Sequence, residues 1–136
     1  MKILVAVDPS ASSLIAVTKA AELAKKEGAP ITLLAIAETF QDMESLFGSE
    51  ATERLRERAS AALDAAKAIA IAAGLKPKLM LKTGVSPEDI IADAAEKGGF
   101  DLVVMGTRSK KGKTKALGSV ASKVVALAPC SVLVVR

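Results

Sequence analysis

Five short apolar runs recur along the chain, each bounded by residues that favour turns or helix starts. Continuous runs of about four to eight aliphatic residues between turn residues are typical of strands buried on both faces. We therefore predict five strands, over Ile3–Val7, Ile31–Ala37, Lys76–Lys82, Asp101–Met105 and Ser131–Val135. In the third run apolar and polar residues alternate, which predicts a strand with one more exposed face.

Apolar residues at helical spacing fill the intervals between these runs. The predicted helices span Leu14–Ala24, about Glu50–Ala73, Pro87–Lys97 and Ser119 to the residues before Pro129. Gly28 follows the first helix and Ser86 precedes Pro87 at the start of the third, as helix ends require. Phe40–Ser49 is predicted as a polar connection. Within it Met43, Leu46 and Phe47 form either a partner or lid surface or a small apolar cluster beneath the connection.

Strands and helices thus alternate through the whole chain, an order that requires right-handed crossovers and gives a parallel sheet with helices on both faces. We predict one doubly wound, Rossmann-like α/β domain over residues 1–136, a length that suits a single domain. In such sheets ligands bind beyond the carboxyl ends of the strands, where the strand order reverses. The positions of interest are therefore Asp8, Ala35–Glu38, Thr83–Gly84 and Gly106–Ser119.

The composition excludes several classes of function. The chain has no His, which excludes Ser-His-Asp and Cys-His catalysis and most zinc sites. Three Phe, with no Trp or Tyr, do not favour an aromatic platform for nucleic-acid bases. The single cysteine, Cys130, agrees with a reducing compartment. Asp8 ends the first apolar run too early for a secretory leader, and no apolar stretch reaches the roughly 20 residues of a membrane span, so we expect a cytoplasmic protein.

The net charge of +4 comes from one segment. Five cations without an acid lie between positions 108 and 115: Arg108, Lys110, Lys111, Lys113 and Lys115. The rest of the chain has 14 basic and 15 acidic residues, a net charge of −1. Gly106, Gly112 and Gly118 lie before, within and after this segment. Gly118 with Ser119 opens a helix whose free amides favour an anion. We predict that the loop binds a phosphate or another anion, rather than nucleic acid.

Three stretches of the sequence resemble one known family. They are Ile3–Asp8 followed by Ser10, then Asp101–Arg108, and finally Gly118–Val120 with Ala128–Val135. Together these stretches, spread over essentially the whole chain, resemble the universal stress proteins. The resemblance implies a sheet with strand order 3-2-1-4-5 and a homodimer formed through the last strand, residues 131–135.

Many universal stress proteins bind ATP through the pattern G-x-x-G-x(9)-G-[ST]. Gly106, Gly118 and Ser119 match it here. Ser109 occupies the place of the second glycine, and eight residues rather than nine separate it from Gly118. The resemblance implies that this loop, with Arg108 and Ser109 in it, holds the phosphates of ATP or another adenine nucleotide, with or without magnesium.

The resemblance also implies an adenosine site. Asp8 matches the family residue that contacts ribose or adenine, and Ile36 matches a position whose backbone meets the adenine edge. Asp8 also ends a buried strand, where a carboxylate commonly caps the following turn. A capping role and a ligand contact are compatible.

Two functions stay open on the sequence. One is a regulatory stress-response protein that binds an adenine nucleotide. The other is a dimer of the same type that binds no nucleotide and acts as a protein interaction module, which Ser109 and the shortened spacing favour. No general base is evident near the loop, so the sequence indicates at most slow ATP hydrolysis and does not identify an enzyme.

Overall fold

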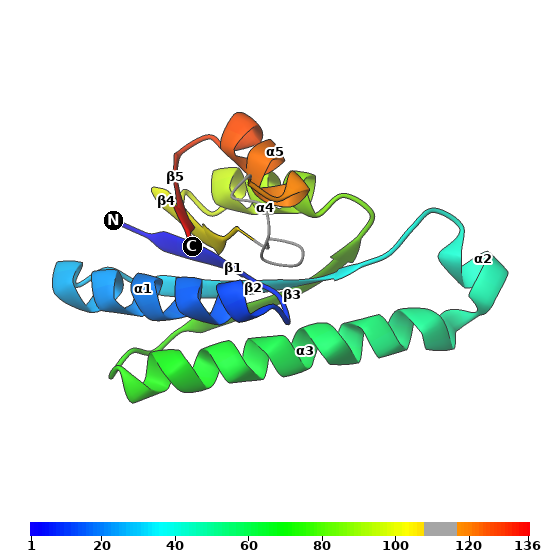
Figure 1. The fold of residues 1–136 in the computed structure, drawn as a ribbon, viewed down its shortest axis with the longest axis horizontal. Helices are drawn as coiled ribbons and strands as arrows, with labels where there is room; N and C mark the ends of the chain where they lie inside the picture. The colour runs from blue at the N-terminus through cyan, green and yellow to red at the C-terminus, as the bar shows by residue number, and fades with distance from the viewer. Residues whose placement is uncertain (108–116) are drawn as a thin grey trace.

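A computed structural model describes residues 1–107 and 117–136 and contains a five-stranded sheet between two layers of helices (Figure 1). The strands are β1 (Ile3–Val7), β2 (Ile31–Glu38), β3 (Lys78–Gly84), β4 (Leu102–Gly106) and β5 (Ser131–Val135). Their order is β3-β2-β1-β4-β5, and every neighbouring pair is parallel. The predicted doubly wound sheet and its strand order are confirmed.

The described helices are α1 (Ala11–Glu27), α2 (Met43–Phe47), α3 (Ser49–Ala72), α4 (Pro87–Lys97) and α5 (Ser119–Leu127). Four of them confirm the predicted helices. The short helix α2 lies inside the segment predicted as a polar connection, so that prediction is wrong at residues 43–47. Met43 is buried, and the rings of Phe40 and Phe47 meet edge to face with their centroids 5.8 Å apart. Apolar contacts therefore hold a helix that is too short to show a hydrophobic period.

The third strand begins later than the sequence predicts, at Lys78 rather than Lys76, and ends at Gly84 rather than Lys82. It pairs with β2 from Thr32 opposite Lys78 to Glu38 opposite Gly84. Pro77 has no backbone N–H and precedes the paired region. The strand is therefore displaced toward the carboxyl end of β2, although its type and exposure agree with the prediction.

Two apolar cores lie on opposite faces of the sheet, with α1 and α3 over one face and α4 and α5 over the other (Figure 1). Along β1, Ile3 and Val5 join the first core and Leu4 joins the second. Burial of both faces explains why this strand is a continuous apolar run. None of the described helices combines the length and the apolar composition that a membrane span needs.

This topology fixes where a ligand site can form. The chain leaves β1 toward β2 on one side, and β4 lies on the other side of β1, so the strand order reverses between β1 and β4. Asp8 follows β1 directly and Gly106 is the last residue of β4. The two residues therefore lie at the carboxyl ends of the strands that flank the switch point.

Candidate functional site

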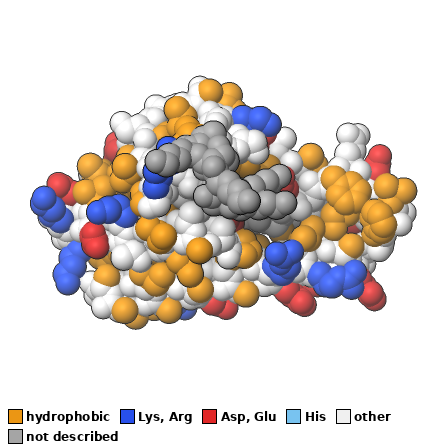
Figure 2. All heavy atoms as spheres, viewed as in Figure 1, with side chains coloured by type: hydrophobic (Ala, Val, Ile, Leu, Met, Phe, Trp, Pro, Cys, Tyr) orange, Lys and Arg blue, Asp and Glu red, His pale blue; other side chains and the backbone are white. Residues whose placement is uncertain are grey.

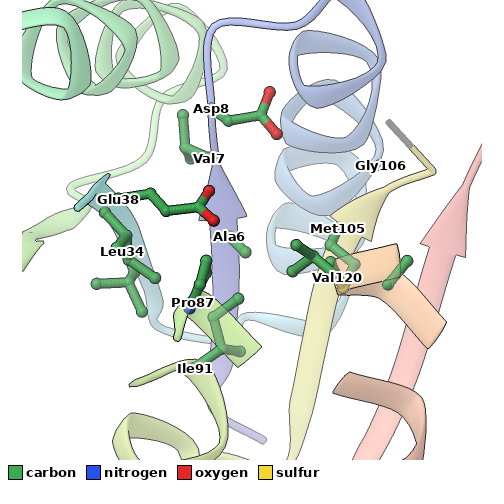
Figure 3. Close-up of a pocket in the computed structure, with 12 residues that line it drawn as sticks. Ala6, Val7, Asp8, Leu34, Glu38, Pro87, Ile91, Met105, Gly106 and Val120 are labelled. Atoms are coloured by element: carbon green, nitrogen blue, oxygen red, sulfur yellow. The ribbon is translucent and has the colours of Figure 1, made fainter. Parts of the chain in front are cut away.

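A cleft opens at the carboxyl ends of β1, β2 and β4, between these strand ends and the first turns of α4 and α5 (Figure 3). Its apolar lining includes Leu34, Ile36, Ile91 and Met105. Among the described residues, Asp8 and Glu38 are the charged side chains that line it. The cleft thus combines an apolar floor with two carboxylates at its rim, the composition typical of a small-molecule site.

The side chain of Asp8 is held by the turn that leads into α1. Its Oδ1 accepts a hydrogen bond of 2.7 Å from the backbone N–H of Ser10. The N–H of Asp8 donates to Oγ of Ser13 at 2.9 Å, and Ser13 is 2% exposed. Ser10 caps α1, because its Oγ accepts from the N–H of Ser13. The capping role of Asp8 is confirmed, and it fixes the carboxyl group beside the cleft.

Gly106 is required by a close approach of two backbones. A β-carbon on Gly106 would stand 2.7 Å from both the carbonyl carbon and the carbonyl oxygen of Ser12. Beyond Gly106, the N–H of Thr107 donates to the carbonyl of Val135 at 3.2 Å, and the carbonyl of Thr107 accepts from the N–H of Gly118 at 3.0 Å. This last hydrogen bond brings the start of α5 next to the end of β4.

The predicted site residues fall into three groups. Asp8, Ile36 and Gly106 line the cleft together. Gly118 is the N-cap of α5 and Ser119 is its first residue, while the next two residues, Val120 and Ala121, line the cleft. The remaining three predictions, on Arg108, Ser109 and Gly112, lie outside the described residues. Thr83 and Gly84 are the last two residues of β3, and they do not line the cleft.

Glu38 lines the cleft and falls within the range Ala35–Glu38 that the sequence singles out, although the sequence assigns it no ligand contact. It is the last residue of β2, opposite Gly84 in register, and Figure 3 shows its carboxyl group extending toward β1 near Ala6. Its spacing from Ile36 indicates that it faces the cleft, because residues two apart in a strand share a face and Glu38 follows Ile36 by two. A carboxylate only accepts hydrogen bonds, so the two acids favour ligand groups that donate, such as hydroxyls and amines.

The described residues contain no group of three or more His, Cys, Asp or Glu side chains that could hold a metal ion. Asp8 and Glu38 are therefore the acidic groups at the cleft in this part of the chain, without a third acid beside them.

The fold is that of a doubly wound parallel α/β protein with a cleft at its switch point. The sequence model described as the universal stress protein family matches residues 1–136, so the chain belongs to that family. The Universal stress protein YxiE of Bacillus subtilis (strain 168) is 33% identical over 146 residues, covering 99% of this chain and 98% of that protein. The structure of universal stress protein UspA from Lactobacillus plantarum superposes with a TM-score of 0.86 at 27% identity, over 100% of this chain and 97% of that one.

Two similar structures were solved with nucleotides. One is a universal stress protein in complex with cAMP, with a TM-score of 0.74 at 26% identity, covering 100% of this chain and 97% of that one. The other is the universal stress protein from Archaeoglobus fulgidus in complex with dAMP, with a TM-score of 0.74 at 25% identity, covering 100% and 98%. Each of these two similar proteins thus holds an adenine nucleotide.

Proposed function

We propose that this protein binds an adenine nucleotide, ATP foremost, in the cleft at the carboxyl ends of β1, β2 and β4, and acts as a regulatory stress-response protein. The observation that carries the proposal is the convergence of Asp8, Ile36 and Gly106 on one cleft at the switch point. The two nucleotide complexes of similar structures support the choice of an adenine nucleotide. The proposed place of action is the cytoplasm, in line with a single half-buried cysteine.

The adenosine end would occupy the apolar part of the cleft. A ribose hydroxyl would donate to the carboxylate of Asp8, whose position is fixed by Ser10 and Ser13 before any ligand arrives. The backbone of Ile36 would meet the adenine edge, and its own side chain lies in the apolar floor. An orientation fixed in advance lowers the entropy lost on binding.

The phosphate end would lie toward the start of α5. Gly118 and Ser119 begin a nine-residue helix, whose first amides and dipole favour an anion. Arg108, Ser109 and Gly112 are proposed to complete this end, with the cations of the loop supplying charge where the family has a second glycine. Magnesium is proposed to arrive with the phosphates, since Mg²⁺ is usually held by one or two carboxylates together with substrate phosphates and water.

Calorimetric titration of ATP into the purified protein tests the proposal. Asp8→Asn keeps an oxygen that can accept from Ser10 but removes the charge, so the turn is expected to stay folded. We expect ATP affinity to fall about tenfold to a hundredfold in this variant, the range for a lost charged hydrogen bond. The matched control is Asp64→Asn on the exposed side of α3, which should bind as the parent does.

The absorption spectrum gives an independent reading, because a chain without Trp and Tyr absorbs little at the wavelengths where proteins usually do. Adenine carried through purification would therefore stand out, and mass spectrometry of the denatured sample would identify it. A sample without adenine and without heat on ATP addition, with or without magnesium, would contradict the nucleotide proposal.

The second candidate is an interaction module that binds no nucleotide. It is favoured by exposed apolar residues around α2, where Figure 2 shows hydrophobic side chains gathered at one end of the molecule. Phe40, Leu46 and Phe47 are 49%, 68% and 65% exposed. The negative outcome of the ATP titration would favour this candidate.

We also propose that two copies associate through β5, residues 131–135. This strand is an edge of the sheet, and Leu133 on it is 36% exposed. An apolar edge strand leaves unpaired backbone groups that a second copy can satisfy.

A further inference from the structure

A second concave surface lies beside the proposed nucleotide cleft, since Met80 and Lys82 on it are opposite Leu34 and Ile36 of the cleft in register, and it extends to the amino ends of the strands. It is bordered by Lys2, Pro30 and Phe100, which precede β1, β2 and β4, and by the exposed face of β3 and the last turns of α4. Its volume is about 520 Å³. That volume lies within the roughly 300–1,000 Å³ of sites that hold small molecules. We call this surface the β3–α4 groove.

The β3–α4 groove is strongly cationic. Five lysines line it, Lys2, Lys76, Lys78, Lys82 and Lys97, against one described acid, Asp93. General basicity does not explain this concentration, because the chain outside residues 108–115 has a net charge of −1. The groove therefore gathers positive charge in a part of the chain that is otherwise balanced.

Two of the five lysines have structural roles at the end of α4. Lys97 pairs with Asp93 at 3.1 Å. The Nζ of Lys2 donates to the carbonyl of Gly98 and lies 4.8 Å from the ring centre of Phe100. Both cations lie near the carboxyl end of α4, where the helix dipole favours positive charge. Their presence is explained without a ligand.

The other three lysines are different. Among the described residues, no carboxylate lies within 4.0 Å of the amino group of Lys76, Lys78 or Lys82. Lys78 and Lys82 are four residues apart on one strand, so they share a face and lie about 13 Å apart along it. In register, Lys78 is opposite Thr32 and Lys82 is opposite Ile36, and Met80 lies between the two lysines. The row of cations therefore runs along the length of the groove.

The floor beneath this row is apolar. Met80 and Phe100 both pack against the second core, and Ala94 of α4 is buried within it. Leu79, at the rim, is 40% exposed. A ligand that matches this surface has negative charges along one side and an apolar or aromatic body on the other.

Lysines on an edge strand also have a simpler use, because they prevent pairing with the edge of another sheet. That use accounts for charge on β3. It does not account for an apolar concavity in front of the charges. The two explanations differ in what they predict for anion binding.

We propose that the β3–α4 groove binds a small organic polyanion of the organic-phosphate class, with an apolar or aromatic body and at least two negative charges. Lysine suits such a ligand because its ammonium is a point charge on a flexible stem and needs no bidentate geometry. The groove and the nucleotide cleft share no lining residue among those described, although Lys82 of the groove is opposite Ile36 of the cleft in register.

Fluorescence anisotropy of pyranine, a pyrene dye with three sulfonates and no adenine, tests the proposal on the full chain. We expect saturable binding that Lys78→Gln/Lys82→Gln weakens about tenfold, equivalent to about 1.4 kcal/mol. The matched control is Lys25→Gln/Lys26→Gln, an equal change of charge in the last turn of α1, which should bind as the parent does. Naphthyl phosphate, which has an aromatic body and no group that reacts with lysine, should displace the dye more strongly than sulfate at the same ionic strength.

Several results would overturn the proposal. Equal weakening by both double variants would assign the effect to net charge alone. The triple variant Lys110→Gln/Lys111→Gln/Lys113→Gln tests whether the dye binds to the loop instead. The dye would be assigned to the loop if this variant lost dye binding while Lys78→Gln/Lys82→Gln bound the dye as the parent does. Absence of saturable binding would leave the lysines with edge protection only. In that case Lys78→Gln/Lys82→Gln would raise the mass measured by light scattering without any change in anion binding.

Discussion

The backbone of Gly106 approaches that of Ser12 so closely that a β-carbon on Gly106 would stand 2.7 Å from the Ser12 carbonyl. The glycine at the end of β4 is therefore needed by the fold itself, whatever the loop beyond it binds. The close approach joins the last residue of β4 to the first turn of α1, and both elements border the switch point.

Gly106→Ala should destabilise the protein. The clash is with backbone atoms, which cannot turn aside as a side chain can, so we expect about 2–3 kcal/mol, the upper part of the range for overpacking. Urea unfolding followed by circular dichroism measures it. Gly74→Ala is the comparison, because Gly74 has a φ of 86° but open space around it, and should cost only about 1 kcal/mol. Equal destabilisation of the two variants would contradict the close approach to Ser12.

Ser13→Ala should lower both stability and ATP affinity. The hydroxyl of Ser13 is buried and accepts from the N–H of Asp8, so its removal leaves that N–H without its partner. We expect a decrease of about 1–3 kcal/mol in the free energy of unfolding. Ser122→Ala, at an exposed position of α5, serves as the control and should change neither quantity. If the variant is less stable but its ATP affinity is unchanged, the turn at Asp8 does not contribute to nucleotide binding.

Neutralising the loop should weaken nucleotide binding if its cations hold the phosphates in place of the family's second glycine. We expect Lys110→Gln/Lys111→Gln/Lys113→Gln to lower ATP affinity, with a larger effect at low salt because exposed charges are screened. Calorimetry at two ionic strengths measures both. Affinity insensitive to the triple change would reject this compensating role while leaving the site at Asp8 untouched.

Burial raises the pKa of the Cys130 thiol above its ordinary value of 9.0, and the negative charge of Asp101 raises it further, against a smaller opposing hydrogen bond from the Val103 backbone. The unfolded chain then loses this proton more readily than the folded one. The contribution of Cys130 to stability is therefore complete below about pH 9 and declines as the pH rises above it. Cys130→Ala should lack this alkaline decline in urea unfolding, and parallel pH profiles of the two proteins would contradict it.

Light scattering tests the association through β5. The parent should have the mass of a dimer and Leu133→Asp that of a monomer, because the new charge would be buried at the interface between the copies. Leu46→Asp on α2 is the control, since Leu46 is more exposed and lies on a different element, and it should remain a dimer. A monomeric parent at working concentration would refute the dimer.

The sequence predicts most of the fold because, in most elements, the spacing of apolar residues agrees with the Gly, Pro and capping residues at the ends of the element. In β1 the predicted and observed bounds are identical, since both faces are buried and Asp8 ends the run. At α2 the prediction fails because the helix depends on tertiary burial of Met43 rather than on any repeat. Glu38 lies within the range that the sequence singles out, but its place in the cleft lining comes from the structure.

The two edges of the sheet differ in a way that limits how large an assembly of this chain can become. One edge is β5, on which Leu133 is exposed. The other edge is β3, which carries Lys78 and Lys82 and is directly preceded by Pro77. When two copies join through β5, the combined sheet ends in β3 on both sides. Lysines on these outer strands would disfavour pairing with a further copy, so the proposed association through β5 would give a closed pair rather than an open fibre.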